Sequence, residues 1–121
     1  MPVNKKNPTR VLIVEDEPVL ALTLEELLVD GGFEVVGTTG KLEKALTLIG
    51  SAVFDVAIID ANLAGVSAGP AATALTAREL PFIVVSGYSP EQLQPAFHGG
   101  VFIRKPYRPD DLFRVLKELV P

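Results

Sequence analysis

Short apolar runs along the chain alternate with segments in which apolar residues recur at helical spacing. Residues 11–14, 56–59 and 82–85 are such runs, and they are rich in valine and isoleucine. Their length and branched side chains are typical of strands that are buried on both faces of a parallel sheet. Residues 33–37 and 101–103 are two further candidates, so five strands are expected.

Between these runs, leucines and alanines spaced three and four residues apart predict helices. The first helix should begin near Pro18, because proline lacks an amide hydrogen and suits the first helical position, and should stop at Gly31. A second helix should end at Gly50, a third should cover residues 70–78, and the last should open at Pro109. The expected buried faces contain Leu20, Leu24, Leu27 and Leu28 in the first helix, Leu42, Ala45, Leu46 and Ile49 in the second, and Leu112, Val115, Leu116 and Leu119 in the last.

The segment between the fourth and fifth strands has conflicting signals. Ser89 followed by Gln92 has the form of a capping box that starts a helix. Pro95 comes soon afterwards and interrupts any longer helix, so a short or irregular fourth helix is expected. Five strands that alternate with five helices predict an α/β fold with a parallel sheet and right-handed crossovers.

Length and composition narrow the range of functions. The 121 residues suit one domain over residues 10–121, and the polar residues 1–9 predict a flexible leader before it. A net charge of -4 argues against direct binding to nucleic acid, and output through a DNA-binding segment after Val120 is not expected. The chain has no cysteine, which excludes disulfides and thiolate metal sites. Its apolar runs are too short for membrane insertion, so a cytoplasmic protein is expected.

Polar side chains gather where the predicted strands end. Glu15 and Asp16 follow the first strand, and Asp60 follows the third. Ser86 follows the fourth strand and Lys105 the fifth. Because ligands of open α/β sheets bind outside the carboxyl ends of the strands, these residues are expected to converge on one rim.

This set of residues suits magnesium-dependent transfer of a phosphoryl group to an aspartate. Asp16, Asp60 and a backbone carbonyl just beyond Asp60 can supply the oxygen ligands that Mg²⁺ prefers, with Glu15 holding a water of its shell. Lys105 would relieve the repulsion among the three carboxylates. Asp60 would be the covalent acceptor, and the Ser86 hydroxyl would donate to an oxygen of the transferring group.

Each of these residues also has a purely structural interpretation. Asp16 could place negative charge at the start of the first helix, and Asp60 could form a turn with Asn62. Ser86 could equally belong to a turn, and a residue such as Lys105 is commonly a solvated surface group. Their joint placement at four strand ends favours the functional interpretation.

The sequence resembles the response regulator receiver family of two-component systems over residues 10–119. The resemblance rests on VLIVEDEP at 11–18, VAIID at 56–60, VVSG at 84–87 and RKP at 104–106. For the fold it implies the flavodoxin-like (βα)5 arrangement, a doubly wound parallel sheet of five strands in the order 2-1-3-4-5.

For the site, the resemblance implies that a histidine kinase or a histidine phosphotransfer protein phosphorylates Asp60, with Ser86 and Lys105 gripping the phosphoryl group. It also implies a Mg²⁺ site, formed by Glu15, Asp16, Asp60 and the backbone carbonyl of Asn62. Family members are signalling switches that catalyse only their own phosphoryl transfer and dephosphorylation. The chain is therefore not expected to be an enzyme with an external substrate, and should signal by contact between proteins.

The family usually transmits phosphorylation through a moving hydroxyl residue and an aromatic residue three positions before the lysine. These positions are occupied here by Ser86 and Phe102. The bond before Pro106 is expected to be cis.

The loop after Asp60 departs from the common family pattern. Ala64 and Ala68 stand where many receivers have proline and glycine. The sequences Asn-Leu-Ala-Gly at 62–65 and Ser-Gly-Tyr at 86–88 are instead similar to a subgroup of stand-alone receivers. Such proteins act by protein contact or as phosphate relays.

Two other hypotheses stay open on the sequence alone. A hydrolase of the haloacid dehalogenase type also combines a nucleophilic aspartate, a hydroxyl residue, a lysine and Mg²⁺, but it needs a second aspartate where this chain has Asn62. A receiver-like scaffold that never carries phosphate would account for the unusual loop after Asp60.

Overall fold

The computed structural model describes residues 7–120 of the chain, so residues 1–6 of the expected leader lie outside the described residues. Thr9 was assigned to the same leader, but it is buried. The carbonyl of Thr9 accepts a hydrogen bond from the Glu34 amide at 2.9 Å. Thr9 is therefore packed with the domain.

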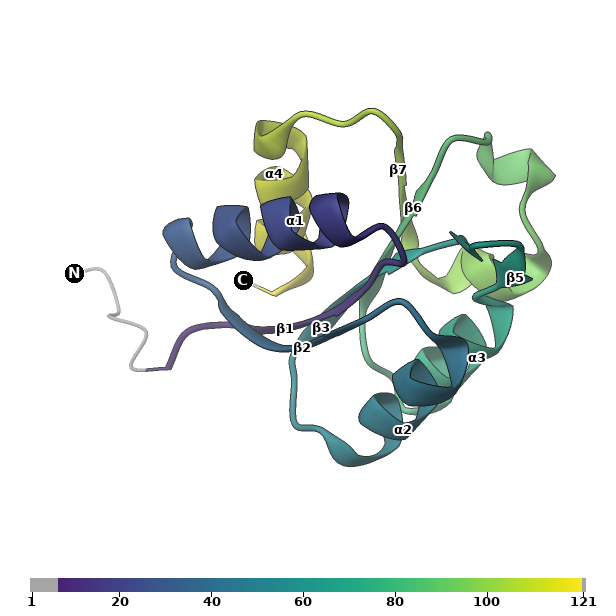
Figure 1. Cartoon of the computed structure of the whole chain (residues 1–121), viewed down its shortest axis with the longest axis horizontal. Coiled ribbons are helices and arrows are strands. Elements are labelled where there is room, and N and C mark those ends of the chain that lie inside the picture. The colour runs from purple at the N-terminus through teal and green to yellow at the C-terminus, as the bar shows by residue number, and fades with distance from the viewer. Residues whose placement is uncertain (1–6, 121) are drawn as a thin grey trace.

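A parallel sheet forms the centre of the described part of the chain (Figure 1). Its five strands are β1 (Arg10–Val14), β2 (Glu34–Thr39), β3 (Val56–Asp60), β6 (Phe82–Ser86) and β7 (Val101–Arg104). Across the sheet they run in the order β2-β1-β3-β6-β7, which confirms the expected 2-1-3-4-5 arrangement of a flavodoxin-like fold. The strand order reverses between β1 and β3, and a crevice at the carboxyl ends of these strands follows from that reversal.

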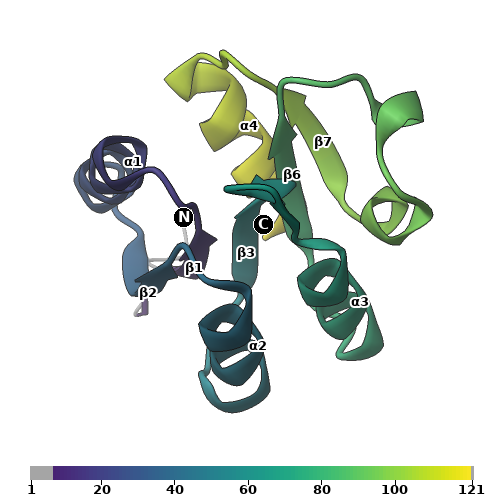
Figure 2. The same cartoon turned by 45° about the vertical axis from the view of Figure 1, so that its right-hand side comes forward.

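Two layers of α-helices cover the sheet (Figure 2). In residues 7–120 these are α1 (Pro18–Asp30) and α4 (Pro109–Leu119) on one face, and α2 (Leu42–Ser51) and α3 (Gly69–Ala77) on the other. Val11 and Ile13 of β1 belong to the core under α1 and α4, and Leu12 and Val14 belong to the core under α2 and α3. Because both faces are covered, the strands can be apolar throughout.

Two leucines that were assigned to buried helix faces are exposed, which corrects the expectation. Leu20 of α1 is 42% exposed because it borders an open groove beside Tyr107 instead of the sheet. Leu46 of α2 is 37% exposed. It follows the fully buried Ala45, and successive residues of a helix point about 100° apart.

The expected fourth helix is replaced by two short 3-10 turns, η1 (Pro90–Gln92) and η2 (Pro95–Gly99). Leu93 and Gln94 between them are extended, with ψ values of 152° and 149°. Gln94 precedes a proline, whose ring disfavours the helical region for the residue before it. The described chain therefore has four α-helices rather than five, and the prediction of a short or irregular segment is confirmed.

A small antiparallel hairpin after β3 was not expected from the sequence. It pairs β4 (Asn62–Leu63) with β5 (Val66–Ser67) across a two-residue turn. Ala64 and Gly65 in that turn have φ values of 53° and 90°. The Gly65 amide donates to Oδ1 of Asn62 at 2.7 Å, which fixes the turn.

No helix within residues 7–120 is long and apolar enough to cross a lipid bilayer.

Candidate functional site

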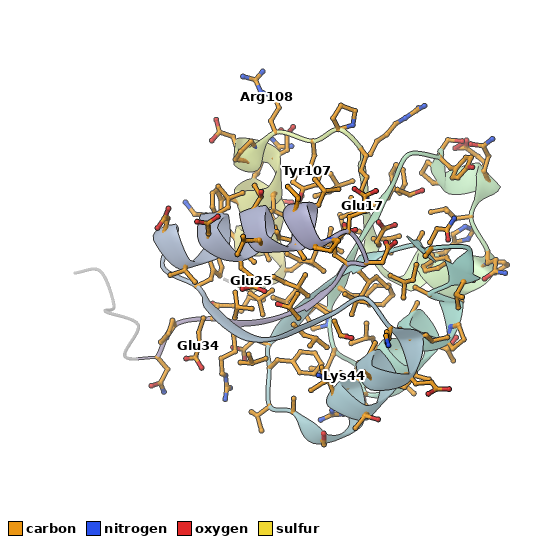
Figure 3. The ribbon with its side chains drawn as sticks, in the orientation of Figure 1. Glu17, Glu25, Glu34, Lys44, Tyr107 and Arg108 are labelled. Atoms are coloured by element: carbon orange, nitrogen blue, oxygen red, sulfur yellow. The ribbon has the colours of Figure 1, made fainter. Side chains whose placement is uncertain are left out.

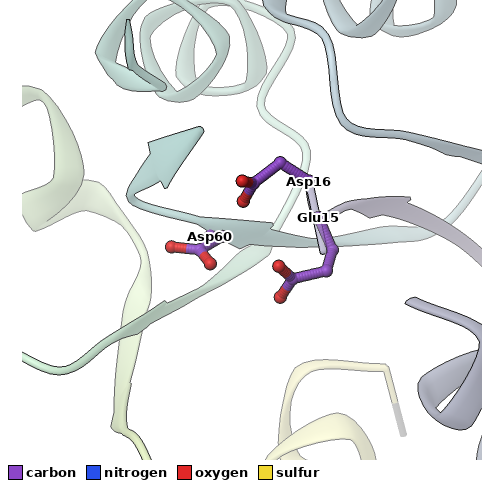
Figure 4. A group of neighbouring side chains, drawn as sticks. All are labelled: Glu15, Asp16 and Asp60. Atoms are coloured by element: carbon purple, nitrogen blue, oxygen red, sulfur yellow. The ribbon is translucent and has the colours of Figure 1, made fainter. Parts of the chain in front are cut away.

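Three carboxylates meet at the reversal point of the sheet. Glu15 and Asp16 follow β1 and Asp60 ends β3, two strands that are neighbours in the sheet. One oxygen of each carboxylate lies within 4.8 Å of the others, and Figure 4 shows the three groups turned toward a common space. Glu15 and Asp60 are buried. Such a group of oxygens is a suitable set of ligands for a hard divalent cation.

The turn after β2 closes against Asp16 at a glycine. A Cβ atom on Gly40 would lie 2.6 Å from Cα of Asp16 and 3.1 Å from the carbonyl oxygen of Glu15. The Glu15 amide donates to the carbonyl of Thr39 at 2.9 Å, which joins the same two segments. Only glycine permits this approach, and no sequence pattern indicated a role for Gly40.

Lys105 supplies the positive charge at this rim. Its Nζ donates to Oδ2 of Asp60 at 2.6 Å and to Oε1 of Glu15 at 3.4 Å. Burial alone would lower the pKa of Lys105, but the hydrogen bond and charge of Asp60, together with those of Glu15, raise it overall. The pKa of Glu15 is also raised, chiefly because the group is buried and additionally because Asp60 is close.

Ser86 reaches the same place from the end of β6. The Lys105 amide donates to the carbonyl of Ser86 at 2.8 Å, so the ends of β6 and β7 are held together. The side chain of Ser86 is buried, and it lines a cavity of about 290 Å³ with Asp60, Asn62 and Lys105. The structure therefore brings the residues that were expected at four strand ends to one rim.

Side chains at the strand ends share one local contact, in which an oxygen accepts a hydrogen bond from the amide two residues later. At the ends of the parallel strands this holds for Glu15 with Glu17 at 3.2 Å, Thr39 with Lys41 at 3.1 Å, Asp60 with Asn62 at 3.1 Å and Ser86 with Tyr88 at 3.0 Å. The turn-forming interpretations of Asp60 and Ser86 therefore hold together with their placement at the site. We call this contact the strand-end turn.

Phe102 lies apart from the carboxylates, in the middle of β7 opposite Val84. It is half-buried and lines a second cavity of about 310 Å³ with Val84, Leu93 and Phe97. The peptide bond between Lys105 and Pro106 is cis, the geometry that the resemblance implies.

Several polar residues at the cavity over Asp60 were not anticipated. Ser67 reaches it from β5, and Gln92 and Gln94 reach it from the segment of the two 3-10 turns. No sequence pattern indicated them, because their position depends on the unexpected hairpin and on the irregular backbone after β6.

The arrangement can bind an anionic group next to a cation. Lys105 and the Ser86 hydroxyl can donate hydrogen bonds into the cavity, and the carboxylates can hold a divalent ion beside it. Asp60 takes part in both arrangements, since it lines the cavity and is also one of the three clustered carboxylates.

Comparisons with known proteins agree with this geometry. The family model for the response regulator receiver domain matches residues 11–117. PdtaR of Mycobacterium tuberculosis, a transcriptional regulatory protein, is 29% identical over 91% of the chain, and PhyR of Methylorubrum extorquens, a phyllosphere-induced regulator, is 30% identical over 91%. The chain spans 56% and 43% of these two proteins, about half the length of these curated relatives.

Solved structures show the same fold. The solution structure of SdrG from Sphingomonas melonis Fr1 is 35% identical, with a TM-score of 0.79 and coverage of 94% of this chain and 98% of that one. The BeF3-activated conformation of SdrG is 34% identical, with a TM-score of 0.77 and coverage of 97% and 100%. A family match over most of the chain, together with this fold, identifies the protein as a member of the response regulator receiver domain family.

Proposed function

We propose that the chain is a phosphorylation-controlled switch of a two-component phosphorelay in the cytoplasm. Asp60 takes a phosphoryl group from a histidine kinase or a histidine phosphotransfer protein, and the altered surface signals by contact with another protein. The observation that carries this proposal is the position of Asp60. Its carboxylate is 2.6 Å from the Lys105 ammonium, lies within the group of three acids, and lines a cavity that also contains the buried Ser86.

In the proposed reaction, an oxygen of Asp60 attacks the phosphorus of a phosphohistidine. A P–O bond forms, the P–N bond breaks, and its electron pair stays on the imidazole of the donor. Lys105 donates hydrogen bonds to the phosphoryl oxygens, whose negative charge its ammonium offsets. The Ser86 oxygen accepts from the Tyr88 amide, so its own hydrogen can be donated to a phosphoryl oxygen.

A Mg²⁺ ion fits the donor set of the site. Glu15, Asp16, Asp60 and the backbone carbonyl of Asn62 would hold it, all of them the oxygen ligands that this ion prefers. When bound, Mg²⁺ supplies positive charge that offsets both the crowded carboxylates and the phosphoryl oxygens. Asp16→Asn should therefore weaken Mg²⁺ binding by roughly tenfold, as measured by titration calorimetry, and an unchanged affinity would exclude Asp16 as a ligand.

Reversal of the switch belongs to the same proposal. Water adds to the phosphorus of phosphorylated Asp60, which releases inorganic phosphate and restores the carboxylate. For output, Ser86 moves toward the phosphoryl group and Phe102 changes its position beside the cavity that it lines. SdrG has a BeF3-activated conformation, which supports testing the same reagent on this chain.

The deciding experiment measures the intact mass of the protein after incubation with acetyl phosphate and Mg²⁺. The wild-type chain should gain one phosphate, and Asp60→Asn should gain none. Asp60→Asn is preferred to Asp60→Ala, because an amide oxygen can still accept from the Asn62 amide. A wild-type chain that gains no phosphate, and whose amide spectrum does not respond to beryllofluoride, contradicts the proposal and favours a scaffold without phosphate.

The same material tests the hydrolase hypothesis. Steady turnover of a generic phosphate ester, lost in Asp60→Asn, would assign the chain to an enzyme. Asn62 in place of the second aspartate supports the switch instead.

A further inference from the structure

Two segments that are distant in the sequence form walls of the open cavity over Asp60. The hairpin of β4 and β5 contributes Asn62, Gly65 and Ser67 to one wall. The segment 87–97, which contains the first 3-10 turn and the start of the second, contributes another wall, including Leu93 and Gln94.

A side-chain hydrogen bond joins the two walls. The Ser67 hydroxyl donates to Oε1 of Gln94 at 2.8 Å. The same hydroxyl oxygen accepts from the Gly69 amide at 3.0 Å, which fixes Ser67 at the start of α3. A Cβ atom on Gly69 would lie 2.7 Å from Oε1 of Gln94, so the Gln94 amide packs directly over this glycine.

Phe97 anchors the segment that carries Gln94 in the core, with Leu93 and Ala96 packed beside it, whereas residues 90–92, 94 and 95 are exposed. Among residues 87–100, Phe97 is the buried residue and the others are half-buried or exposed. Segments with little burial open locally at low cost in free energy. The hydrogen bond from Ser67 to Gln94 can therefore determine the position of the exposed part of segment 87–97.

The wall separates the two cavities of the site. Leu93 and Phe97 line both the cavity over Asp60 and the cavity in which Phe102 lies. Gln94 lies between these two residues in the sequence. A change at Gln94 therefore acts on both cavities.

We propose that the hydrogen bond between Ser67 and Gln94 is a latch that keeps the wall of segment 87–97 closed over Asp60. Gln94 is then a positioning residue that limits the access of water to the phosphoryl group. The inference rests on the proposed phosphorylation of Asp60. Loss of the latch opens the wall, and the phosphoryl group is hydrolysed faster.

The test compares Ser67→Ala, Gln94→Ala and the double variant with the wild-type chain. Each protein is phosphorylated with acetyl phosphate and Mg²⁺ and freed of the reagent, and its phosphorylated fraction is followed by intact mass. Each single variant should lose phosphate roughly two to ten times faster, the range expected for one hydrogen bond. The double variant should be no faster than the faster single variant, because both substitutions break the same bond.

Three further variants separate the latch from a general effect on structure. Ser67→Thr keeps the hydroxyl and should retain nearly the wild-type rate. Gly69→Ala should push the Gln94 side chain away and act like Gln94→Ala, although both partners remain. Ser51→Ala removes a hydroxyl that donates to the Thr47 carbonyl on α2 and should change nothing.

Amide resonances measured by NMR test whether segment 87–97 connects the cavity over Asp60 to Phe102. Without phosphate, Gln94→Ala should shift the amide resonance of Phe102, whereas Ser51→Ala should not. Single-variant rates equal to the wild-type rate, additive effects in the double variant, or a Ser67→Thr rate as fast as that of Ser67→Ala would each overturn the latch. A wild-type chain that gains no phosphate overturns the proposed function itself, so the two failures are distinguishable.

Discussion

Tyr107 lies close enough to the acidic rim, the group formed by Glu15, Asp16 and Asp60, to be affected by the charges of Glu15 and Asp60. It lies on the connection between β7 and α4, beside the groove along α1 (Figure 3). Its pKa is raised above the ordinary value of 10.0, first by burial and then by the charge of Glu15. The pKa of Lys105 is likewise raised above 10.5. Both groups therefore bind their protons more tightly in the folded state.

The two raised pKa values predict how the free energy of unfolding changes in alkaline solution. A raised pKa stabilises the fold fully below the ordinary value, and this contribution is lost as pH rises through the raised value. The free energy of unfolding should therefore decrease as pH rises above about 10. Tyr107→Phe should make this decrease shallower, as measured by chemical denaturation between pH 8 and 12, conditions that bracket the ordinary value. Tyr88→Phe, at an exposed tyrosine, is the matched control, and an equal effect there would contradict the assignment to Tyr107.

Gly40 and Gly50 allow a paired prediction at single residues. Gly40→Ala should destabilise the fold by about 1–3 kcal/mol, because the new Cβ atom meets the backbone of Asp16. It should also weaken Mg²⁺ binding, since Asp16 is displaced. Gly50→Ala in α2 meets nothing within 4 Å and should stabilise the fold by about 0.5–1 kcal/mol through helix propensity. Thermal denaturation and a Mg²⁺ titration check both variants, and similar results for the two would refute the argument.

At the scale of elements, the hairpin of β4 and β5 makes its own prediction. Its turn needs two residues with positive φ, and Ala64 occupies the first of these positions with φ 53°. Ala64→Gly should raise the free energy of unfolding by about 0.5–1 kcal/mol, because the left-handed region strains a residue that has a Cβ atom. Gly65→Ala, at φ 90°, should lower it. Denaturant unfolding measures both changes, and a loss of stability in Ala64→Gly would be the contrary result.

The elements also show where sequence reasoning succeeds. Buried parallel strands are continuous apolar runs, so β1, β3 and β6 were predicted within a residue of their bounds. The acidic rim followed from the position of polar residues after these strands. The hairpin was missed because its two-residue strands are too short to show a period and its turn begins with alanine instead of asparagine.

Other parts of the site could not be read from local patterns. The contact of Gly40 with Asp16 and the bond between Ser67 and Gln94 join residues that are distant in the sequence. Their partners become known only when the loops are placed in three dimensions. The exposure of Leu20 has the same origin, since it depends on the groove beside Tyr107 rather than on helical spacing.

For the whole molecule, the two ends of the sheet carry different charged groups, with the ion pair of Arg10 and Asp55 at one end and the three carboxylates at the other. Asp55, before β3, accepts hydrogen bonds from the amide of Arg10 at 2.8 Å and from its guanidinium at 3.3 and 3.4 Å. The acidic rim lies at the other ends of β1 and β3, roughly 16 Å away along the strands.

Asp55→Ala should therefore lower the free energy of unfolding without changing the proposed reaction at Asp60. The free energy of unfolding should fall by about 1 kcal/mol, because the pair is only partly buried. The rate of phosphorylation by acetyl phosphate should stay within error of the wild-type rate at a temperature where both proteins are folded. A slower reaction in this variant would mean that the two ends are coupled.

The strand-end turn has a consequence for how such a domain can change over generations. The carboxylate of Asp60, the proposed acceptor, also holds its own loop through Oδ1, and an asparagine at position 60 would keep that contact while losing the nucleophile. The single substitution Asp60→Asn would thus remove the nucleophilic carboxylate and leave the turn after β3 in place. A lineage can lose phosphorylation at this position and keep a folded domain, which leaves a protein-binding surface free to acquire a phosphate-independent use.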